Sequence, residues 1–495
     1  MVRASTGGSG LRRTRGRIAA ADLRLLDAVG ARRSVVLDRV LPGLGRWANH
    51  GVLWFVVGIG ISVRKDRRTR RAALRGAAAI GIASPLTNLV FKNVFRRSRP
   101  PITGVPLVRH LVRPPITPSF PSGHSASAAA FATAVAMEAP AAVAVPVGVL
   151  AASVAVSRVV SGAHYPSDVV VGAAVGTGCG LLTRLWWPVR PPGRATAAES
   201  DADVPAPVSG AGVVVLINDG AGTTNPQLSE VIRAELPDAE VLVLPGDEME
   251  EALRRAAGSA RVVAVAGGDG TVNAAARHLA GTDVPLLVLP AGTLNHFAHE
   301  LGVHTVDDAL SALRAGHAVR VDVGRVDGRV FLNTCAFGLY TDLVAFRGRW
   351  EGRIGKWPAM LAGMFHVLRR GQPQSVLIDG VPRLVWMIFL GNGRYHPAGF
   401  APAYRSRLDD GLLDVRIVEA GTPFAATWMV FAMLTRTLRW CPAYRQYTSP
   451  RVHFATADPV LRLSLDGEYT EVSEQATLRI DPAALLVYRP PGDVE

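Results

Sequence analysis

The stretch "PSFPSGHSASAAAFATAVAMEAPAAVAVPVGVLAASVAV", residues 118–156, decides what kind of fold the first half of the chain can adopt. A Pro-Ser-Gly turn places His124 directly before an alanine- and valine-rich run that contains one charged residue, Glu138. The run is long enough for two membrane-spanning helices that meet near "MEAP" (137–140), because one span needs about 20 apolar residues. A titratable imidazole at the mouth of this run predicts a site at a membrane surface.

Three further apolar segments of nearly spanning length flank this stretch: Trp47–Val63, Ala72–Phe91 and Val169–Trp187. Together they predict an all-α, multi-span membrane helical bundle over residues 49–187. Residues 1–48 are basic and are expected to form an N-terminal segment that contains an amphipathic helix or a further span. We therefore expect a multi-pass protein of the cell membrane.

The chain of 495 residues has a net charge of +14, and its arginines cluster next to the apolar segments, at 3–17, 64–71 and 184–194. Basic residues beside membrane spans favour the cytoplasmic side and bind anionic phospholipid, so we expect a lipid surface and not nucleic acid as the partner. A solvated basic face without a partner is the alternative. The oligomeric state is not indicated by the sequence.

With the basic loop 64–71 inside, residues 91–101, 121–124 and 157–168 are expected to meet at the outer face of the membrane. The three cysteines lie far apart without a CxxC pair and give neither a disulfide framework nor a zinc site. The first apolar run starts near Trp47, too late for a signal peptide.

The second half of the chain has the pattern of a soluble protein. Residues 188–211 are rich in Pro, Ala and Ser and are expected to form a linker. Short apolar strands separated by helical stretches then predict an α/β nucleotide-binding lobe with a parallel sheet over 212–325. Alternating, turn-rich strands predict a β-rich, β-sandwich-like second lobe over 326–495. The expected parallel strands are "GVVVLIND" (212–219), "AEVLVLP" (239–245), "RVVAVAG" (261–267) and "VPLLVLP" (284–290).

Three polar groups in the membrane half have the chemistry of phosphoryl transfer. Cations bind phosphate, a glycine turn offers backbone N–H groups, and of two histidines one can attack phosphorus while the other protonates the leaving oxygen. Asp168, four residues after His164, can accept a proton from its ring and fix the tautomer. The groups are "KNVFRRSRP" with Lys92 and Arg99, "PSGH" with Ser122, Gly123 and His124, and "SRVVSGAHYPSD" with Arg158, His164 and Asp168.

These groups resemble the motifs of the type-2 phosphatidic acid phosphatase and haloperoxidase superfamily, and the likeness covers about residues 50–187. The resemblance implies that His164 is the nucleophile, His124 the acid and Asp168 the partner of His164. No cofactor is implied for this half, and a vanadate haloperoxidase is disfavoured because those enzymes are generally not multi-span membrane proteins. The phosphate-binding residues implied are Lys92, Arg99, Ser122, Gly123 and Arg158.

A second constellation lies in "VVAVAGGDGTVNAAARHL" (262–279), which runs from a strand through a glycine turn into a helix. Glycines let backbone N–H groups approach phosphates, and the helix directs its positive end at them. Asp269 can serve magnesium or the transferred proton. A second loop, "LPAGTLNHFAHELG" (289–302), has the same form and offers Thr293 and Asn295.

The two loops resemble the diacylglycerol kinase catalytic domain shared by sphingosine kinases and bacterial lipid kinases, over about residues 212–490. This resemblance implies ATP and Mg²⁺ as cofactors and a lipid alcohol as acceptor. It also implies a structural magnesium held by Asp410 and the carbonyls of Arg407 and Leu412, and a general base in "LDGE" (465–468), either Asp466 or Glu468. The implied nucleotide-binding residues are Asn218, Gly267, Gly268, Asp269, Gly270, Thr271, Thr293 and Asn295.

The second half departs from its family pattern at two places. The turn "NDGAG" (218–222) lacks the usual proline and hydroxyl, and His296 stands where many relatives have aspartate. The glycine-Asp motif also occurs in NAD kinases and phosphofructokinases, and an Asp-Gly hairpin is the alternative for "LDGE".

The sequence thus predicts a bifunctional membrane lipid enzyme. An outward-facing lipid phosphate phosphatase with a phosphohistidine intermediate is joined to a cytoplasmic ATP-dependent lipid kinase. The alternatives are a kinase with a catalytically silent membrane anchor, or a lipid phosphatase with a nucleotide- or lipid-sensing pseudokinase domain.

Overall fold

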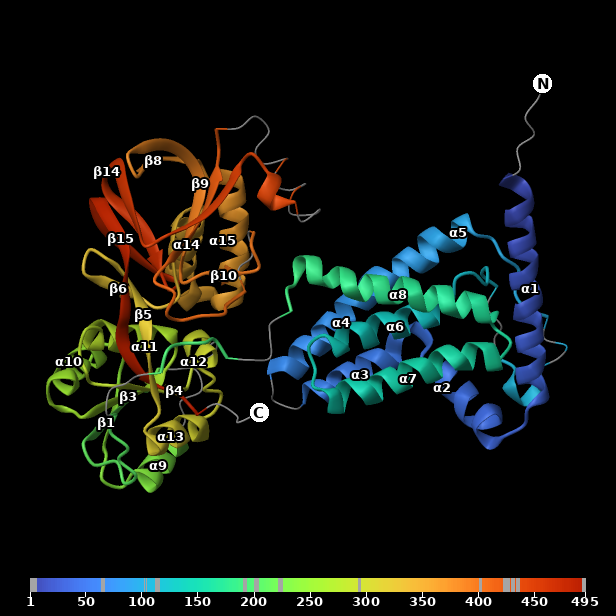
Figure 1. Cartoon of the computed structure of the whole chain (residues 1–495), viewed down its shortest axis with the longest axis horizontal. Helices are drawn as coiled ribbons and strands as arrows, with labels where there is room; N and C mark the ends of the chain where they lie inside the picture. The colour runs from blue at the N-terminus through green and yellow to red at the C-terminus, as the bar shows by residue number, and fades with distance from the viewer. Residues whose placement is uncertain are drawn as a thin grey trace. The chain divides into compact units, whose positions relative to one another are not determined.

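The computed structural model divides the chain into two compact units, Met1–Arg190 and Pro191–Glu495 (Figure 1). The structure describes residues 7–63, 67–101, 103, 105–111, 116–189, 194–199, 204–220, 226–292, 295–399, 403–421, 428, 432 and 437–491.

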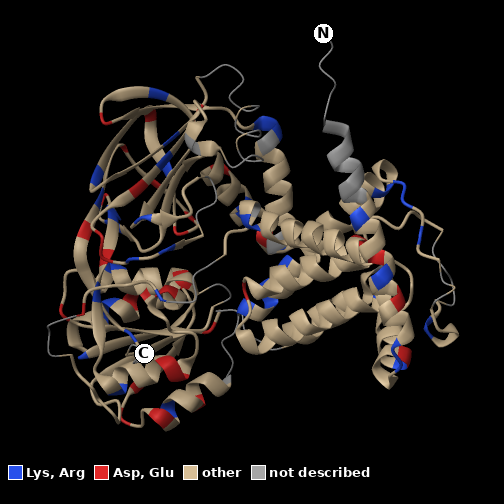
Figure 2. Cartoon of the chain, turned by 45° about the vertical axis from the view of Figure 1, so that its right-hand side comes forward, with Lys and Arg blue, Asp and Glu red and all other residues tan. Residues whose placement is uncertain are grey.

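The described part of the first unit is helical. Three of its helices, Arg68–Val94, Ala141–Val160 and Pro166–Leu185, are long and apolar enough to cross a membrane by length and composition. Figure 2 shows the middle parts of these helices almost free of charged residues. The helices are α1 (Gly7–Ala31), α2 (Leu41–Trp47), α3 (Val52–Ser62), α4 (Arg67–Pro85), α5 (Lys92–Val94), α6 (Gly123–Ala136), α7 (Ala141–Val160) and α8 (Pro166–Trp186), with a π-helical turn, Leu86–Phe91, joining α4 to α5.

One expected span is shorter than predicted, and another helix is shorter than the length that a membrane span needs. The segment Trp47–Val63 is broken at Gly51, which has a φ of +76°, so that α3 begins only at Val52. The run 118–156 does divide at "MEAP", but α6 has 14 residues and α7 has 20. α6 ends at Ala136, and Pro140, four residues later, lacks the N–H that would bond the Ala136 carbonyl in a continued helix.

Small residues let α6 and α8 approach closely. A Cβ on Gly172 would overlap the carbonyl oxygen of Ser122, and a Cβ on Gly176 would overlap that of Ala126. Four-residue spacing keeps the glycines on one face of α8, as in other tightly packed membrane helices. This packing brings the start of α6 beside the start of α8.

A charged cluster holds the opposite end of the same helices. Arg75 on α4 is fully buried and donates hydrogen bonds to Glu138 (2.5 Å) and to Thr183 on α8 (3.1 Å). Arg71 also pairs with Glu138, and both guanidinium groups lie over the ring of Trp187. Glu138, the only charged residue of the apolar run, thus forms structural ion pairs with partners that are buried or half-buried.

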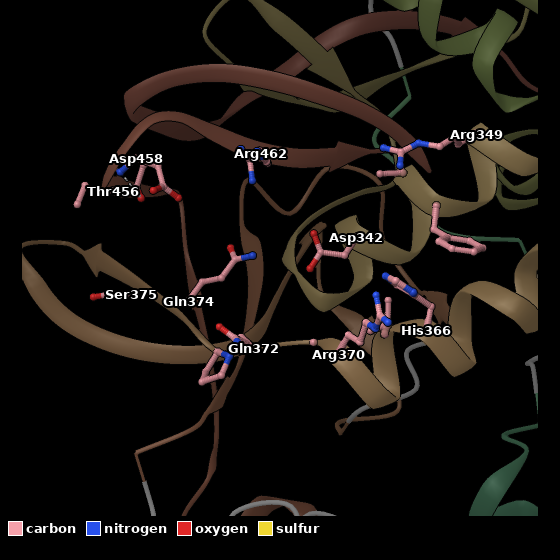
Figure 3. Close-up of a pocket in the computed structure, with 16 residues that line it drawn as sticks. Asp342, Arg349, His366, Arg370, Gln372, Gln374, Ser375, Thr456, Asp458 and Arg462 are labelled. Atoms are coloured by element: carbon pink, nitrogen blue, oxygen red, sulfur yellow. Dashed lines mark hydrogen bonds between the residues drawn. The ribbon is translucent and has the colours of Figure 1, made fainter.

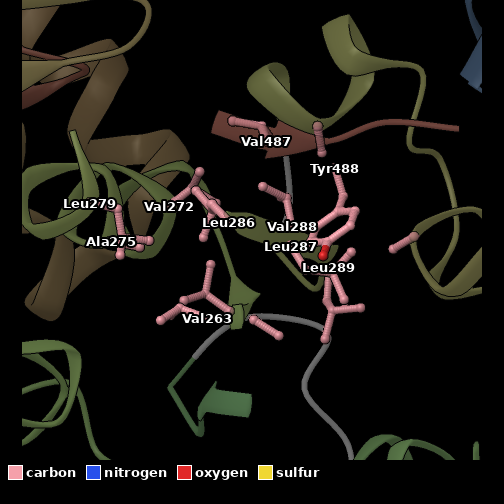
Figure 4. Close-up of a cluster of buried hydrophobic side chains, with 14 of the residues drawn as sticks. Val263, Val272, Ala275, Leu279, Leu286, Leu287, Val288, Leu289, Val487 and Tyr488 are labelled. Atoms are coloured by element: carbon pink, nitrogen blue, oxygen red, sulfur yellow. The ribbon is translucent and has the colours of Figure 1, made fainter. Parts of the chain in front are cut away.

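The second unit begins with four parallel strands in the order β2-β1-β3-β4. Every residue of β3 is buried, because the sheet is covered on both faces. Figure 4 shows the core, in which Val263 and Leu286 belong to one buried cluster with Val272 of α11 and Val487 of the last strand. The elements are β1 (Val213–Asn218), β2 (Glu240–Leu244), β3 (Val262–Gly267), β4 (Leu286–Pro290), α9 (Pro226–Glu235), α10 (Met249–Ser259), α11 (Asp269–Leu279), α12 (His296–Leu301) and α13 (Val306–Ala315).

The second lobe corrects the expectation of a β-sandwich. β9 pairs with β7, β7 with β14, β14 with β8, and β8 again with β9, all antiparallel, so that these strands close a barrel. Closure removes the free edges that a sandwich leaves. The lobe contains β5 (Ala318–Val326), β6 (Arg329–Phe331), β7 (Thr334–Gly338), α14 (Leu339–Ile354), α15 (Lys356–Arg370), β8 (Gln374–Ile378), β9 (Val381–Asn392), β10 (Tyr395–His396), β11 (Tyr404–Arg405), β12 (Leu413–Glu419), β13 (Tyr444–Ser449), β14 (Arg451–Leu465) and β15 (Glu468–Tyr488).

The strand β15 makes one continuous sheet of both lobes. Its first half pairs with β14, and its end pairs parallel to β4 at Val487. Part of the expected linker also packs on this unit, since Thr196 exchanges backbone hydrogen bonds with Ser406 and Leu408. The sequence pattern did not predict this packing.

Candidate active sites

The structure brings the three predicted phosphatase groups to one end of the helices of the first unit. Lys92 lies in α5, Ser122 caps α6, Arg158 lies in the last turn of α7, and Asp168 in the first turn of α8. Arg99 donates a 2.6 Å hydrogen bond from Nη1 to the carbonyl of Ala163, next to His164. Lys92, Arg99, Arg158 and His164 all lie close enough to His124 to act on it electrostatically.

The ring of His164 is oriented by a backbone carbonyl. Nδ1 lies 2.7 Å from the carbonyl oxygen of Ser119 and 3.7 Å from Oδ2 of Asp168. A carbonyl only accepts, so Nδ1 carries the proton and Nε2 keeps its lone pair. The nearest partner of Nδ1 is therefore the carbonyl of Ser119, and the expected partner Asp168 lies within ion-pair distance of the same nitrogen. No sequence signal marks Ser119, because it acts through its main chain.

Burial keeps the ring of His164 neutral. The imidazole is almost completely buried, which lowers its pKa to about 4, although the nearby Asp168 carboxylate opposes this shift and Arg99 and Arg158 reinforce it. A neutral imidazole with a free Nε2 is the nucleophilic form.

Arg158 has the properties of an anion ligand. Its side chain is 2% exposed, Nη1 reaches the carbonyl of Gly45 at 3.5 Å, and Nε has no hydrogen-bond partner among the described residues. A buried guanidinium with an unsatisfied donor is costly unless an anion completes its hydrogen bonds.

His124 and its turn form the third side of this site. Nε2 of His124 lies 2.8 Å from Oδ1 of Asn49, a residue that the motifs did not indicate. Ser122 and Gly123 precede and begin α6, whose positive end attracts negative charge. Asn49 precedes α3, in a segment that carried no motif.

In the second unit the two glycine loops touch each other. A Cβ on Gly292 would overlap Cα of Gly268, and a Cβ on Gly267 would overlap the side chain of Thr271. Asn218 at the end of β1 donates from Nδ2 to Oγ1 of Thr271 at 3.0 Å. Asn218, the first residue of the turn that departs from the family pattern, is thus hydrogen-bonded to the glycine motif. Thr293 lies outside the described residues.

Asn295 shapes its own loop. It accepts a hydrogen bond from the amide of Gly292 (2.9 Å) and donates to that residue's carbonyl (2.8 Å), with a φ of +48°. The side-chain amide thus fixes the backbone of this loop, and its contact with nucleotide stays a prediction.

Three carboxylates are candidates for the kinase site. Asp269 and Glu468 lie at the glycine loops, and Asp466 lies beside residues 332–334. Asp269 accepts from the amide of Phe297 through Oδ1 (3.2 Å), and Oε1 of Glu468 lies 2.8 Å from where a Cβ on Gly270 would be. Asp466 accepts two amides, of Asn333 and Thr334, on Oδ1 and one, of Leu332, on Oδ2. Burial raises the pKa of Asp466 to about 6, against the effect of these amides.

The predicted metal residues lie on one loop after β11. Oδ1 of Asp410 and the carbonyl of Arg407 both lie within 3.5 Å of where a Cβ on Gly393 would be, and the carbonyl of Leu412 accepts from the amide of Gly393. Carboxylate and carbonyl oxygens suit a hard cation. Within the described ranges, no group of three or more His, Cys, Asp or Glu side chains could hold a metal.

A pocket of about 640 Å³ opens between α14, α15, β8 and β14 (Figure 3). Its lining carries four basic side chains, Arg349, His366, Arg370 and Arg462, against two acidic ones, Asp342 and Asp458. Beside it, α15 exposes Leu361, Met364 and Phe365 to solvent.

Comparisons with known proteins agree with this division. A family model for the PAP2 superfamily matches residues 73–192, and one for the diacylglycerol kinase catalytic domain matches residues 212–326. A diacylglycerol kinase of Mycobacterium tuberculosis is 30% identical over 231 residues, which cover 43% of this chain and 71% of that protein. A probable lipid kinase YegS-like of Pseudomonas aeruginosa is 29% identical over 295 residues, covering 56% of this chain and 95% of that protein.

Solved structures also match parts of the chain. A putative diacylglycerol kinase from Bacillus anthracis is 22% identical with a TM-score of 0.44, covering 56% of this chain and 97% of that one. A transmembrane PAP2 type phosphatidylglycerolphosphate phosphatase from Bacillus subtilis is 27% identical with a TM-score of 0.28, covering 34% of this chain and 85% of that one.

The chain therefore combines a membrane-associated phosphatase-type domain with a lipid kinase domain. It belongs to the diacylglycerol kinase family, and a PAP2 superfamily domain precedes the kinase domain in the same polypeptide.

Proposed function

We propose that the protein is a bifunctional membrane lipid enzyme, a phosphatase for lipid phosphates joined to an ATP-dependent kinase for a lipid alcohol. The observation that carries the proposal is the assembly of the nucleophile site: neutral His164 with Nε2 free, beside the buried and unsatisfied guanidinium of Arg158. Burying the Arg158 guanidinium costs desolvation free energy, and a catalytically silent membrane anchor would not need this buried cation.

In the phosphatase reaction, Lys92, Arg99 and Arg158 bind the phosphate oxygens. Nε2 of His164 attacks phosphorus, and the bond to the lipid oxygen breaks while His124 gives that oxygen a proton. Water then attacks the phosphohistidine, giving its proton to His124, and the P–N bond breaks to release phosphate. The carbonyl of Ser119 holds the ring of His164 throughout.

In the kinase reaction, the glycine loops and the start of α11 bind the phosphates of ATP. The residues fit a magnesium ion, because Asp269 and Glu468 both face this loop and Mg²⁺ is usually held by one or two carboxylates together with phosphate oxygens. When bound, the ion neutralises charge on the transferred phosphate. Oδ2 of Asp466 keeps a spare lone pair and is the proposed base for the acceptor hydroxyl.

Two further features support a lipid acceptor and a cytoplasmic kinase. Leu361, Met364 and Phe365 lie on one face of α15, and Arg369 and Arg370 follow at its end, a combination suited to an anionic bilayer surface. The basic stretch 64–71 extends into the first turns of α4, and the positive-inside rule favours a cytoplasmic position for it, which supports a kinase inside and a phosphatase site outside. Asp410, Arg407 and Leu412 are the proposed ligands of a structural magnesium.

The proposal is tested by transfer of labelled γ-phosphate from ATP to lipid by the full-length protein in liposomes that contain diacylglycerol. Labelled lipid that disappears in Asp269→Ala and accumulates further in His164→Ala would support both activities on a shared product. Labelled lipid that His164→Ala leaves unchanged would assign separate substrates or an inert phosphatase. Absence of labelled lipid from the wild type would refute the kinase and favour a sensing domain.

A further inference from the structure

A buried carboxylate outside the phosphatase motifs reaches into the candidate phosphatase site. Asp22 lies on α1 and is only 3% exposed, although most residues from 16 to 31 of this helix are exposed. It accepts hydrogen bonds from the amide of Ser167 (2.9 Å), from the hydroxyl of Ser167 (2.6 Å) and from Nη2 of Arg97 (2.8 Å). Ser167 directly precedes Asp168, so Asp22 fixes the start of α8.

Arg97 connects Asp22 with His164 by two routes. Its Nη1 donates to Oδ1 of Asp168 at 2.7 Å, and the other oxygen of Asp168 lies 3.7 Å from Nδ1 of His164. The carbonyl of Arg97 accepts from the amide of Ser119, whose own carbonyl holds Nδ1 of His164. A shift of Arg97 would therefore move both neighbours of the nucleophilic ring.

The charges of this network also hold the guanidinium of Arg97 in one place. The guanidinium is shared between two carboxylates and lies 3.9 Å from the centre of the Tyr165 ring. Without Asp22, one of its two anionic partners is lost and Arg97 becomes free to compete for a phosphate anion. Lys92, Arg99 and Arg158 supply the cations that the substrate needs.

We propose that Asp22 is a positioning residue of the phosphatase: it locks Arg97 onto Asp168 and Ser119, and so holds Nε2 of His164 in line for attack. The inference rests on the proposed phosphatase function and adds α1 to its site. Asp22 acts on the site through its hydrogen bonds to Arg97 and Ser167, so its loss should lower kcat and leave KM nearly unchanged.

The test compares Asp22→Asn with Asp27→Asn, which changes an exposed carboxylate on the same helix. Initial rates of phosphate release from dioctanoyl phosphatidic acid are measured on the full-length protein in detergent micelles, with His164→Ala as the inactive reference. We expect kcat of Asp22→Asn to fall roughly ten- to hundredfold, since a misplacement of about 1 Å has that effect, with KM within about twofold. Asp27→Asn should match the wild type.

Two further variants separate positioning from folding. Asp22→Glu keeps the charge and should recover part of the lost kcat, while Arg97→Lys cannot bridge two carboxylates and should reproduce the loss. Equal kcat in Asp22→Asn and wild type would overturn the inference, as would a rise of KM that matches the fall in kcat. If Asp22→Asn does not fold, wild-type kcat in Arg97→Lys would overturn it. A wild type no faster than His164→Ala would instead refute the proposed phosphatase itself.

Discussion

The His164 imidazole lies between α7 and α8 in a protein interior that disfavours its charged form. Burial lowers its pKa to about 4, and Arg99 and Arg158 act in the same direction. The ring is therefore neutral, and able to attack phosphorus, at every pH well above 4.

We predict that the acid limb of kcat/KM for lipid phosphate hydrolysis lies near pH 4. Activity should fall only as pH drops through the lowered pKa, because protonation removes the Nε2 lone pair. A pH profile of phosphate release checks this, with the separately titrated ionisation of the substrate taken into account and with recovery at pH 7 as a control for unfolding. An acid limb at about pH 6.5, the ordinary pKa of histidine, would contradict this prediction.

Asp466 offers a second test at the level of one residue. Its pKa is raised to about 6, so the carboxylate is ionised only above that value and kinase kcat should rise with pH through about 6. Asp466→Asn should abolish this limb along with most of the activity. It should also lower the free energy of unfolding by about 1–3 kcal/mol, since one backbone amide loses its acceptor.

The matched comparison for Asp466 is Glu468→Gln, which should keep the pH limb and shift the magnesium dependence of the kinase. Rates measured across pH and Mg²⁺ concentration distinguish the two carboxylates. Loss of the pH limb in Glu468→Gln, with its retention in Asp466→Asn, would reverse the assignment.

Among the elements, the contact of α6 with α8 decides the geometry of the phosphatase site. The start of α6 carries Ser122, Gly123 and His124, and the start of α8 carries Asp168. The amide of Ser122 donates to the carbonyl of Asp168 at 3.0 Å, so the two helix ends are directly joined.

We predict that Gly176→Ala destabilises this pair of helices. The added methyl group would overlap the carbonyl of Ala126, which costs about 1–3 kcal/mol or more, and phosphatase activity should fall while kinase activity stays. Thermal unfolding in detergent measures the loss. The control is Gly178→Ala on the same helix, where a Cβ meets nothing within 4 Å; an equal effect of both substitutions would argue against close packing as the cause.

For the whole molecule, the decisive property is the side of the membrane on which each unit lies. The three native cysteines are buried, so introduced cysteines can report accessibility without removing the native ones. Leu107, between the motifs with Arg99 and Ser122 in the chain, is 84% exposed, and Val208 in the second unit is 65% exposed.

We predict that a membrane-impermeant maleimide labels Leu107→Cys in intact cells but labels Val208→Cys only after the membrane is opened. The positive-inside rule gives this direction, because the basic loop 64–71 should remain in the cytoplasm. The wild-type chain is the control for background labelling. Labelling of both positions in intact cells would contradict opposite placement of the two sites.

Much of this organisation could be predicted from the sequence, because the signals are local. Runs of apolar residues predicted helices α4, α7 and α8, and short apolar runs predicted strands β1 to β4 nearly to the residue. The glycine motif at 267–271 predicted a turn that only small residues allow. In both units the structure has motif residues at the ends of helices and strands, as the sequence predicted.

The sequence by itself determined the chemistry available, since His164, Arg158 and the glycine loops are identified by residue type and spacing. Only the tertiary structure decided how these groups are held. Closure of the barrel depends on pairings between strands far apart in the chain, such as β7 with β14, which no local pattern encodes. The same applies to the backbone carbonyl of Ser119 on His164, and to Asp22, which comes from a helix more than 70 residues before Arg97 to fix it. Contacts of this kind arise from packing, and packing depends on which distant surfaces bury one another.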